Sequence, residues 1–292
     1  MKMRCLRGVS MGVVMTGTLA WGADLPWEAK LPFKEATIHY QLSGNEQGEE
    51  TLYIRDYGRL RAKYHKGAIT AMGMSTPIET VEITDPDWVA SYDLVEKSGS
   101  KTTNPNKLYQ AEYNKLSRGE KKKFEKNAKE LGAGMMARSG TTVTRSSDKV
   151  LGYACDAVSV KGLSTSTVLR GSDVPLRIEI SVMGMKNTTV ATKVDTDSAI
   201  PDNVFAPPAG ITAQLDSQAE AMLEGTVRQM IDTLKEPDGA QKMQQQGGDA
   251  ATMAPGRQAA MEADGVNAAD QEEMMRRMQE AMQQMQQMQP QH

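Results

Sequence analysis

The sequence predicts an α+β fold, in which an antiparallel β-sheet is covered by helices and followed by a C-terminal tail of different composition. Apolar and polar residues alternate over residues 36–103 and again over 141–196, which is typical of strands with one buried face. Residues 105–131 and 217–235 carry apolar residues at helical spacing instead. The change of period and the change of composition together indicate this fold class.

The first 22 residues have the composition of a secretory signal peptide. A basic start precedes an uncharged, mostly apolar stretch over residues 9–20, and small residues around Gly22 predict cleavage before Ala23. These 12 residues rise about 18 Å as a helix, which is too short for a bilayer core about 30 Å thick. A cleaved signal is therefore favoured over an N-terminal membrane anchor. We expect an exported, soluble protein with no transmembrane segment in the mature chain.

Charge and motif content exclude several function classes. Without residues 1–22 the chain keeps 31 basic and 37 acidic residues, a balance that argues against a nucleic-acid partner. Cys155 is then the single cysteine, so no internal disulfide forms and a buried apolar role is favoured over a reactive thiol. The sequence has no zinc-ligand spacing, nucleophile elbow, P-loop or dinucleotide motif. We predict no enzymatic activity and no cofactor.

Residues 36–103 are expected to form four or five strands joined by short turns. A turn at Asp56-Tyr57-Gly58 separates the first strands from a strand that begins near Leu60. Another pair is expected over residues 77–84 and 88–98. Such short connections predict an antiparallel sheet with one solvated face.

The helical insert over residues 105–131 is expected to begin at Asn104-Pro105, an N-cap and first-turn signature. A second helix start at Ser117 has capping-box spacing, and Gly132 is the expected C-cap. Lysines of this insert alternate with glutamates, which favours a solvated face over a basic patch for anionic lipid or nucleic acid. We expect the insert to lie on the sheet as a cover.

Strand character returns over residues 141–196 and ends before the proline-rich segment 206–210. An amphipathic helix over 217–235 then completes a compact domain that we place at residues 23–236. An aliphatic sheet face closed by amphipathic helices predicts a concave apolar site, and direct packing without a cavity is the alternative. The residues predicted to face an apolar ligand, such as a lipid or a lipoprotein acyl chain, are Ile38, Tyr40, Leu42, Leu52, Ile54, Leu60, Ile178 and Ile180.

The tail over residues 237–292 has a low-complexity composition. From Asp238 onward it contains 13 glutamines, 9 methionines and no aromatic residue, so we expect a flexible linker over 238–269 and partial helix over 270–288. Thioethers are ligands for soft metals such as copper(I), but an apolar stripe for a partner helix is favoured. An adaptor or copper-buffering function is therefore the alternative, carried by Met275, Met278, Met282, Met285 and Met288.

Several motifs in order resemble exported proteins of the LolA/LppX-like superfamily. They are Ile38-x-Tyr40, Glu50-Thr51-Leu52-Tyr53-Ile54-x-Asp56-Tyr57-Gly58, Lys101-x-x-Asn104-Pro105, Gly152-Tyr153-x-Cys155 and Ile200-Pro201-x-x-x-Phe205-x-x-Pro208-x-Gly210. The resemblance covers about residues 35–212. It implies an incomplete β-barrel, that is, a strongly curved antiparallel sheet with helices at its open side, in the Gram-negative periplasm. It also implies an apolar cavity that carries lipids or lipoproteins.

Overall fold

Two runs of strands build the sheet in the computed structural model, which describes residues 31–71, 74–138, 140–182 and 185–250. The first run is β1 (Ala36–Gly44), β2 (Glu46–Arg55), β3 (Leu60–Ala71), β4 (Met74–Thr84), β5 (Trp88–Asp93) and β6 (Ser98–Thr103). The second run is β7 (Thr141–Val150), β8 (Tyr153–Val160), β9 (Ser164–Leu169), β10 (Pro175–Val182) and β11 (Met185–Asp195), followed by the short β12 (Gln214–Leu215).

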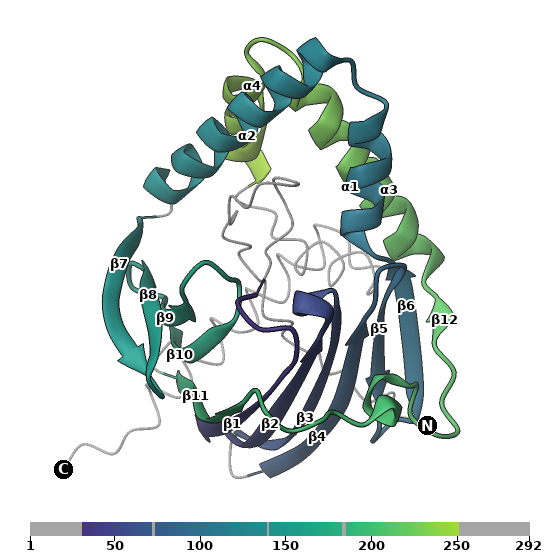
Figure 1. Cartoon of the computed structure of the whole chain (residues 1–292), viewed down its shortest axis with the longest axis vertical. Helices are drawn as coiled ribbons and strands as arrows, with labels where there is room; N and C mark the ends of the chain where they lie inside the picture. The colour runs from purple at the N-terminus through teal and green to yellow at the C-terminus, as the bar shows by residue number, and fades with distance from the viewer. Residues whose placement is uncertain (1–30, 72–73, 139, 183–184, 251–292) are drawn as a thin grey trace, which may run out of the picture. The chain divides into compact units, whose positions relative to one another are not determined.

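These strands form one strongly curved sheet (Figure 1). Within the described ranges it has 12 strands in the order β12-β6-β5-β4-β3-β2-β1-β11-β10-β9-β8-β7. Neighbouring strands pair antiparallel, and the parallel pair of β12 with β6 is the exception. Because β12 and β7 end the order without pairing to each other, the barrel stays open. The predicted fold class is confirmed.

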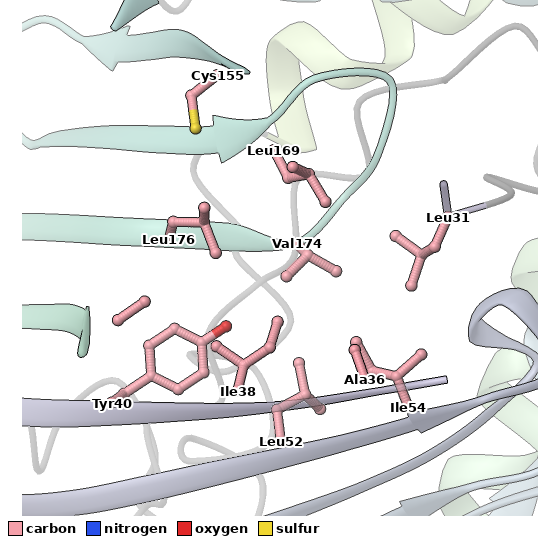
Figure 2. Packing of buried hydrophobic residues seen from close by; sticks show 11 residues of the cluster. Leu31, Ala36, Ile38, Tyr40, Leu52, Ile54, Cys155, Leu169, Val174 and Leu176 are labelled. Carbon is pink, nitrogen blue, oxygen red and sulfur yellow. The ribbon is translucent and has the colours of Figure 1, made fainter. Parts of the chain in front are cut away.

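The main apolar core lies on the concave face. Side chains of β1 and β2 point toward those of the β9–β10 hairpin across the curve of the sheet (Figure 2). Hairpins with aliphatic residues on one face bury that face by bending onto each other, which is how this part of the core closes. Its buried members are Leu31, Ala36, Ile38, Tyr40, Leu52, Ile54, Cys155, Leu169, Val174, Leu176 and Ala191. Cys155 is fully buried, as predicted.

The apolar residues change face between β2 and β3. The cross-strand partners of Leu52 and Ile54 are Lys63 and Arg61, so the concave face turns polar at β3. The apolar residues of β3 to β5 lie on the opposite, convex face, where the connection after β11 covers them. The expectation of one solvated face is therefore wrong, because each half of the sheet buries a different face. The convex cluster comprises Ala62, Val81, Ile83, Ala90 and Tyr92, with Phe205 and Ile211 packed against it.

Arg55 attaches this connection, which includes the short 3-10 helix η2 (Asp202–Phe205), to the sheet. Its guanidinium donates to a carboxylate oxygen of Asp202 at 2.7 Å and to the carbonyl of Ile200 at 2.7 Å. The same group lies 4.7 Å from the ring centre of Phe205. A hydrogen-bonded cation over an aromatic ring fixes the direction in which the connection crosses the sheet.

The helices α1 (Pro105–Asn114), α2 (Arg118–Arg138) and α3 (Ser217–Leu234) pack on one another and meet the sheet chiefly at β6 and β7 (Figure 1). They do not lie flat on the sheet as the predicted cover. The N-cap at Asn104 and the capping box at Ser117 are confirmed by their side-chain hydrogen bonds. The predicted end at Gly132 is wrong, because a helical glycine costs only about 1 kcal/mol and the helix continues toward β7.

The tail begins with a helix where we expected a flexible linker. Helix α4 spans Gly239–Ala250, and the contacts divide the chain into units Met1–Ala240 and Gln241–His292. The predicted signal peptide over 1–22 and the predicted helix over 270–288 lie outside the described residues. Among the helices that are described, none combines the length and the apolar character needed to cross a membrane.

Candidate functional site

The residues predicted to face a ligand lie on the concave face, with Leu60 as the exception. Leu60 is the cross-strand partner of Arg55, so it lies on the convex side and the expectation for it is wrong. The reason is the short 3-10 helix η1 (Asp56–Gly58), which joins β2 to β3 in a register that puts Arg61 opposite Ile54. Those on the concave face are Ile38, Tyr40, Leu42, Leu52, Ile54, Ile178 and Ile180.

Side chains fill the space in front of most of these residues. Ile38 and Ile54 are 0% exposed. The hydroxyl of Tyr40 donates to the carbonyl of Pro175 at 2.9 Å, and burial raises the pKa of Tyr40 well above its usual range. Ile178 and Ile180 remain partly exposed. Within the described residues, most of this apolar surface is therefore the packed core between β1–β2 and β9–β10.

A pocket of about 640 Å³ lies on the polar half of the same face. Its floor is formed by β2 to β4, and its walls come from η1, from the start of α1 and from the loop between β9 and β10. Leu52 contributes apolar surface to the floor, and Asn106 and Gln110 of α1 line the rim. The volume lies within the range of small-ligand sites, about 300–1,000 Å³. This pocket is the candidate site.

The charged side chains of the pocket occur as ion pairs. Arg61 binds Asp173 through two hydrogen bonds of 2.8 and 2.9 Å and also donates to the carbonyl of Gly58 at 2.9 Å. This bidentate pair holds the β9–β10 loop against β3. Further pairs in the lining join Lys63 to Glu82 at 3.5 Å, Lys107 to Asp87 at 2.7 Å and Arg59 to Asp56 at 3.7 Å. Positive and negative charges of the described lining therefore balance.

Helix η1 places an aromatic ring at the pocket in an unusual backbone conformation. Asp56 and Tyr57 have φ values of 51° and 55°, in the left-handed region that non-glycine residues rarely occupy. The amide of Tyr57 donates to the carbonyl of Lys34 at 3.1 Å, and its carbonyl accepts from the amide of Leu31 at 3.2 Å. Tyr57 is 46% exposed. The surrounding chain therefore holds a strained residue that is also partly exposed to solvent.

His65 lies between two carboxylates on the same concave face. Its Nε2 lies 2.6 Å from Glu46 and its Nδ1 lies 3.1 Å from Glu50. The hydrogen bond to Glu46, followed by that to Glu50, raises the pKa of His65 to about 9. Because both ring nitrogens donate only when the ring is protonated, His65 is an imidazolium at neutral pH.

This raised pKa predicts a pH dependence of stability. The contribution of His65 is fully present below its ordinary pKa of 6.5 and is lost as the pH rises toward 9. With solvent screening of a partly exposed group, we expect a loss of about 1–2 kcal/mol over that interval. Urea denaturation of the wild type and of His65→Gln at about pH 6 and about pH 9 measures it.

In His65→Gln the loss of stability between about pH 6 and about pH 9 that we assign to His65 should disappear. The matched control is His39→Gln, because the ring of His39 contacts the hydroxyl of Thr51 at 3.2 Å rather than a pair of carboxylates. An equal pH dependence in the wild type and in His65→Gln would contradict the assignment.

Sequence reasoning did not identify the pocket. The signal that was present is the strand in which Arg59, Arg61 and Lys63 alternate with apolar residues, because it puts three cations on one face. Among the described residues no group of three or more histidine, cysteine or acidic side chains is arranged to hold a metal ion. The alternative metal residues Met275, Met278, Met282, Met285 and Met288 lie outside the described residues.

Comparisons with known proteins give distant similarities only. No protein-family model and no curated protein matches the chain. Among solved structures, an uncharacterised conserved protein from Thermus thermophilus matches with a TM-score of 0.36 and 8% identity, over 62% of this chain and 89% of that one. PNGF-II matches with a TM-score of 0.29 and 14% identity, over 66% of this chain and 33% of PNGF-II. MucB matches with a TM-score of 0.32 and 10% identity, over 64% of this chain and 62% of MucB.

Proposed function

We propose that this chain is an exported binding protein without enzymatic activity, and that its ligand occupies the concave pocket. The observation that carries the proposal is the pocket of about 640 Å³, built jointly by the sheet, η1, α1 and the β9–β10 loop. Walls from segments far apart in the sequence, held by the Arg61–Asp173 pair, give a preformed concave site of the kind that binds small ligands. The signal-like first 22 residues support action in the periplasm.

The lining favours a ligand that is polar where it meets the pocket. The apolar residues that we expected to line a cavity mostly belong to the packed core, whereas the pocket carries ion pairs and amides. If the LolA/LppX-like resemblance extends to function, a lipid or a lipoprotein is bound by its polar head group rather than by its acyl chain. An adaptor or copper-binding role of the tail stays a prediction.

Removing two amides from the pocket rim should weaken ligand binding. Asn106 and Gln110 line the pocket from α1, so the double substitution Asn106→Ala/Gln110→Ala removes hydrogen-bonding groups without touching the buried core. Two neutral hydrogen bonds of about 0.5–1.5 kcal/mol each correspond to about a tenfold loss of affinity. Native mass spectrometry of the mature protein purified from a Gram-negative periplasm reports the bound fraction.

The control is Gln229→Ala, an exposed amide on α3 that does not belong to the pocket lining. We expect it to leave the bound fraction unchanged. Binding that is unaffected by the rim variant would place the ligand elsewhere. A wild type without any co-purifying mass, whose pocket amide resonances also ignore a panel of lipids, sugars and zwitterions, would refute the proposed function.

A further inference from the structure

The lining of the concave pocket discriminates between ligand classes. A phosphate group would meet cations that already carry a carboxylate partner, as Arg61 does with Asp173 and Lys63 with Glu82. A hydrocarbon chain would meet Leu52, Tyr57 and Pro86 among side chains that are mostly charged or polar. A sugar hydroxyl both donates and accepts a hydrogen bond, so it suits a wall in which carboxylates, ammonium groups and amides stand side by side.

The ring of Tyr57 adds the second element of such a site. Tyr57 as a residue is 46% exposed and belongs to the pocket lining, on a backbone with φ of 55°. A glycine would occupy this conformation without strain, so the tyrosine is kept there at a cost to stability. A sugar ring presents one face of C–H groups that packs on an aromatic ring, while its hydroxyl groups point outward to polar side chains.

We propose that the concave pocket binds carbohydrate, with the Tyr57 ring as the stacking surface and with Asn106, Gln110 and the Lys63–Glu82 pair as hydrogen-bonding partners. This inference rests on the proposed function, because it requires the pocket to be the ligand site. The balanced charge of the described lining points to a neutral sugar rather than to a sugar phosphate. The sugar has two possible sources, a free oligosaccharide and the head group of a glycolipid, which share the chemistry that the pocket recognises.

The test uses the full chain and two kinds of probe. Soluble disaccharides of glucose, galactose and N-acetylglucosamine are screened by saturation-transfer difference NMR. Phosphatidylcholine vesicles with and without a monoglycosyl lipid are screened by co-sedimentation. Binding of the disaccharides assigns a free oligosaccharide, and binding confined to the glycolipid vesicles assigns a head group. Either result supports the inference.

The decisive variant is Tyr57→Gly. It removes the ring and relieves the backbone, so we expect a melting temperature equal to or above that of the wild type together with an affinity at least about tenfold lower. Tyr57→Phe keeps the ring and should retain binding. The matched control is Leu151→Gly, because Leu151 is 47% exposed with φ of 51° in the turn between β7 and β8, away from the pocket lining. It should relieve the same strain and leave binding unchanged.

Three results would overturn the inference in different ways. Wild-type affinity for sugar in Tyr57→Gly would show that the ring is not a stacking surface. If no sugar binds while phosphoethanolamine or a zwitterionic dipeptide shifts the amide resonances of the pocket, the carbohydrate inference fails and the proposed binding function stands. If no probe of any class shifts these resonances, both fail.

Discussion

Replacing Leu176 by alanine should lower the free energy of unfolding by about 2–5 kcal/mol, the usual range for a leucine truncated in a packed core. Leu176 is 1% exposed and lies in the cluster where β10 meets β1 and β2 (Figure 2). The truncation removes apolar contacts both with β1 and β2 and with the β9–β10 hairpin. Equilibrium urea denaturation measures the loss as a shift of the midpoint at constant slope.

The control for Leu176 is Ile178→Ala, two residues along the same strand. Ile178 is expected on the same face but is only partly buried, so its truncation should cost less than half as much. Equal losses for the two variants would contradict the claim that side chains fill the space in front of Leu176. A loss below about 1 kcal/mol for Leu176→Ala would do so as well, because it would indicate an unfilled cavity there.

Replacing Asn127 by leucine should cost about 2–4 kcal/mol, because it removes a buried side-chain donor from the carbonyl groups of Leu234 and Glu236. Asn127 lies on α2 and is 1% exposed. Its amide donates to the carbonyl of Leu234 at 2.9 Å and to that of Glu236 at 2.5 Å, where α3 ends. A helix end has carbonyl groups without intrahelical partners, and here the side chain of another helix satisfies them.

The exposed Asn114 at the end of α1 offers the matched control for this substitution. Asn114→Leu should change the free energy of unfolding by about 0.5 kcal/mol or less, the usual effect at an exposed position. Thermal unfolding followed by far-UV circular dichroism compares the two variants. A comparable melting temperature for Asn127→Leu and the wild type would show that α2 does not hold the end of α3.

Strands and helix starts were predictable because their signals are local. The alternation at Ile38, Tyr40 and Leu42 reports a strand whatever surrounds it, and Asn104-Pro105 caps a helix by its own side chain. The face on which Leu60 lies was not predictable, because it depends on the path of the chain through η1. Periodicity reports that a strand alternates but not which side of the sheet each residue joins.

The pocket escaped prediction for a related reason. Asp173 and Arg61 are 112 residues apart, and only the pairing of β1 with β11 brings their strands into one sheet. Apolar alternation also identifies core residues. The residues predicted from it therefore lie mostly in the packed half of the concave face, and the pocket lies in the polar half. The strain at Tyr57 depends on a φ value, which no residue pattern reveals.

The switch of the apolar side between β2 and β3 has a consequence for biogenesis. The first six strands are synthesised long before the segments that cover them. Phe205 and Ile211 pack against the convex cluster, and β11 pairs with β1. Until about residue 211 is available to fold onto the sheet, apolar residues on both faces of β1 to β6 remain exposed to solvent. The first six strands therefore cannot bury both of their apolar faces until nearly the whole domain is available for folding.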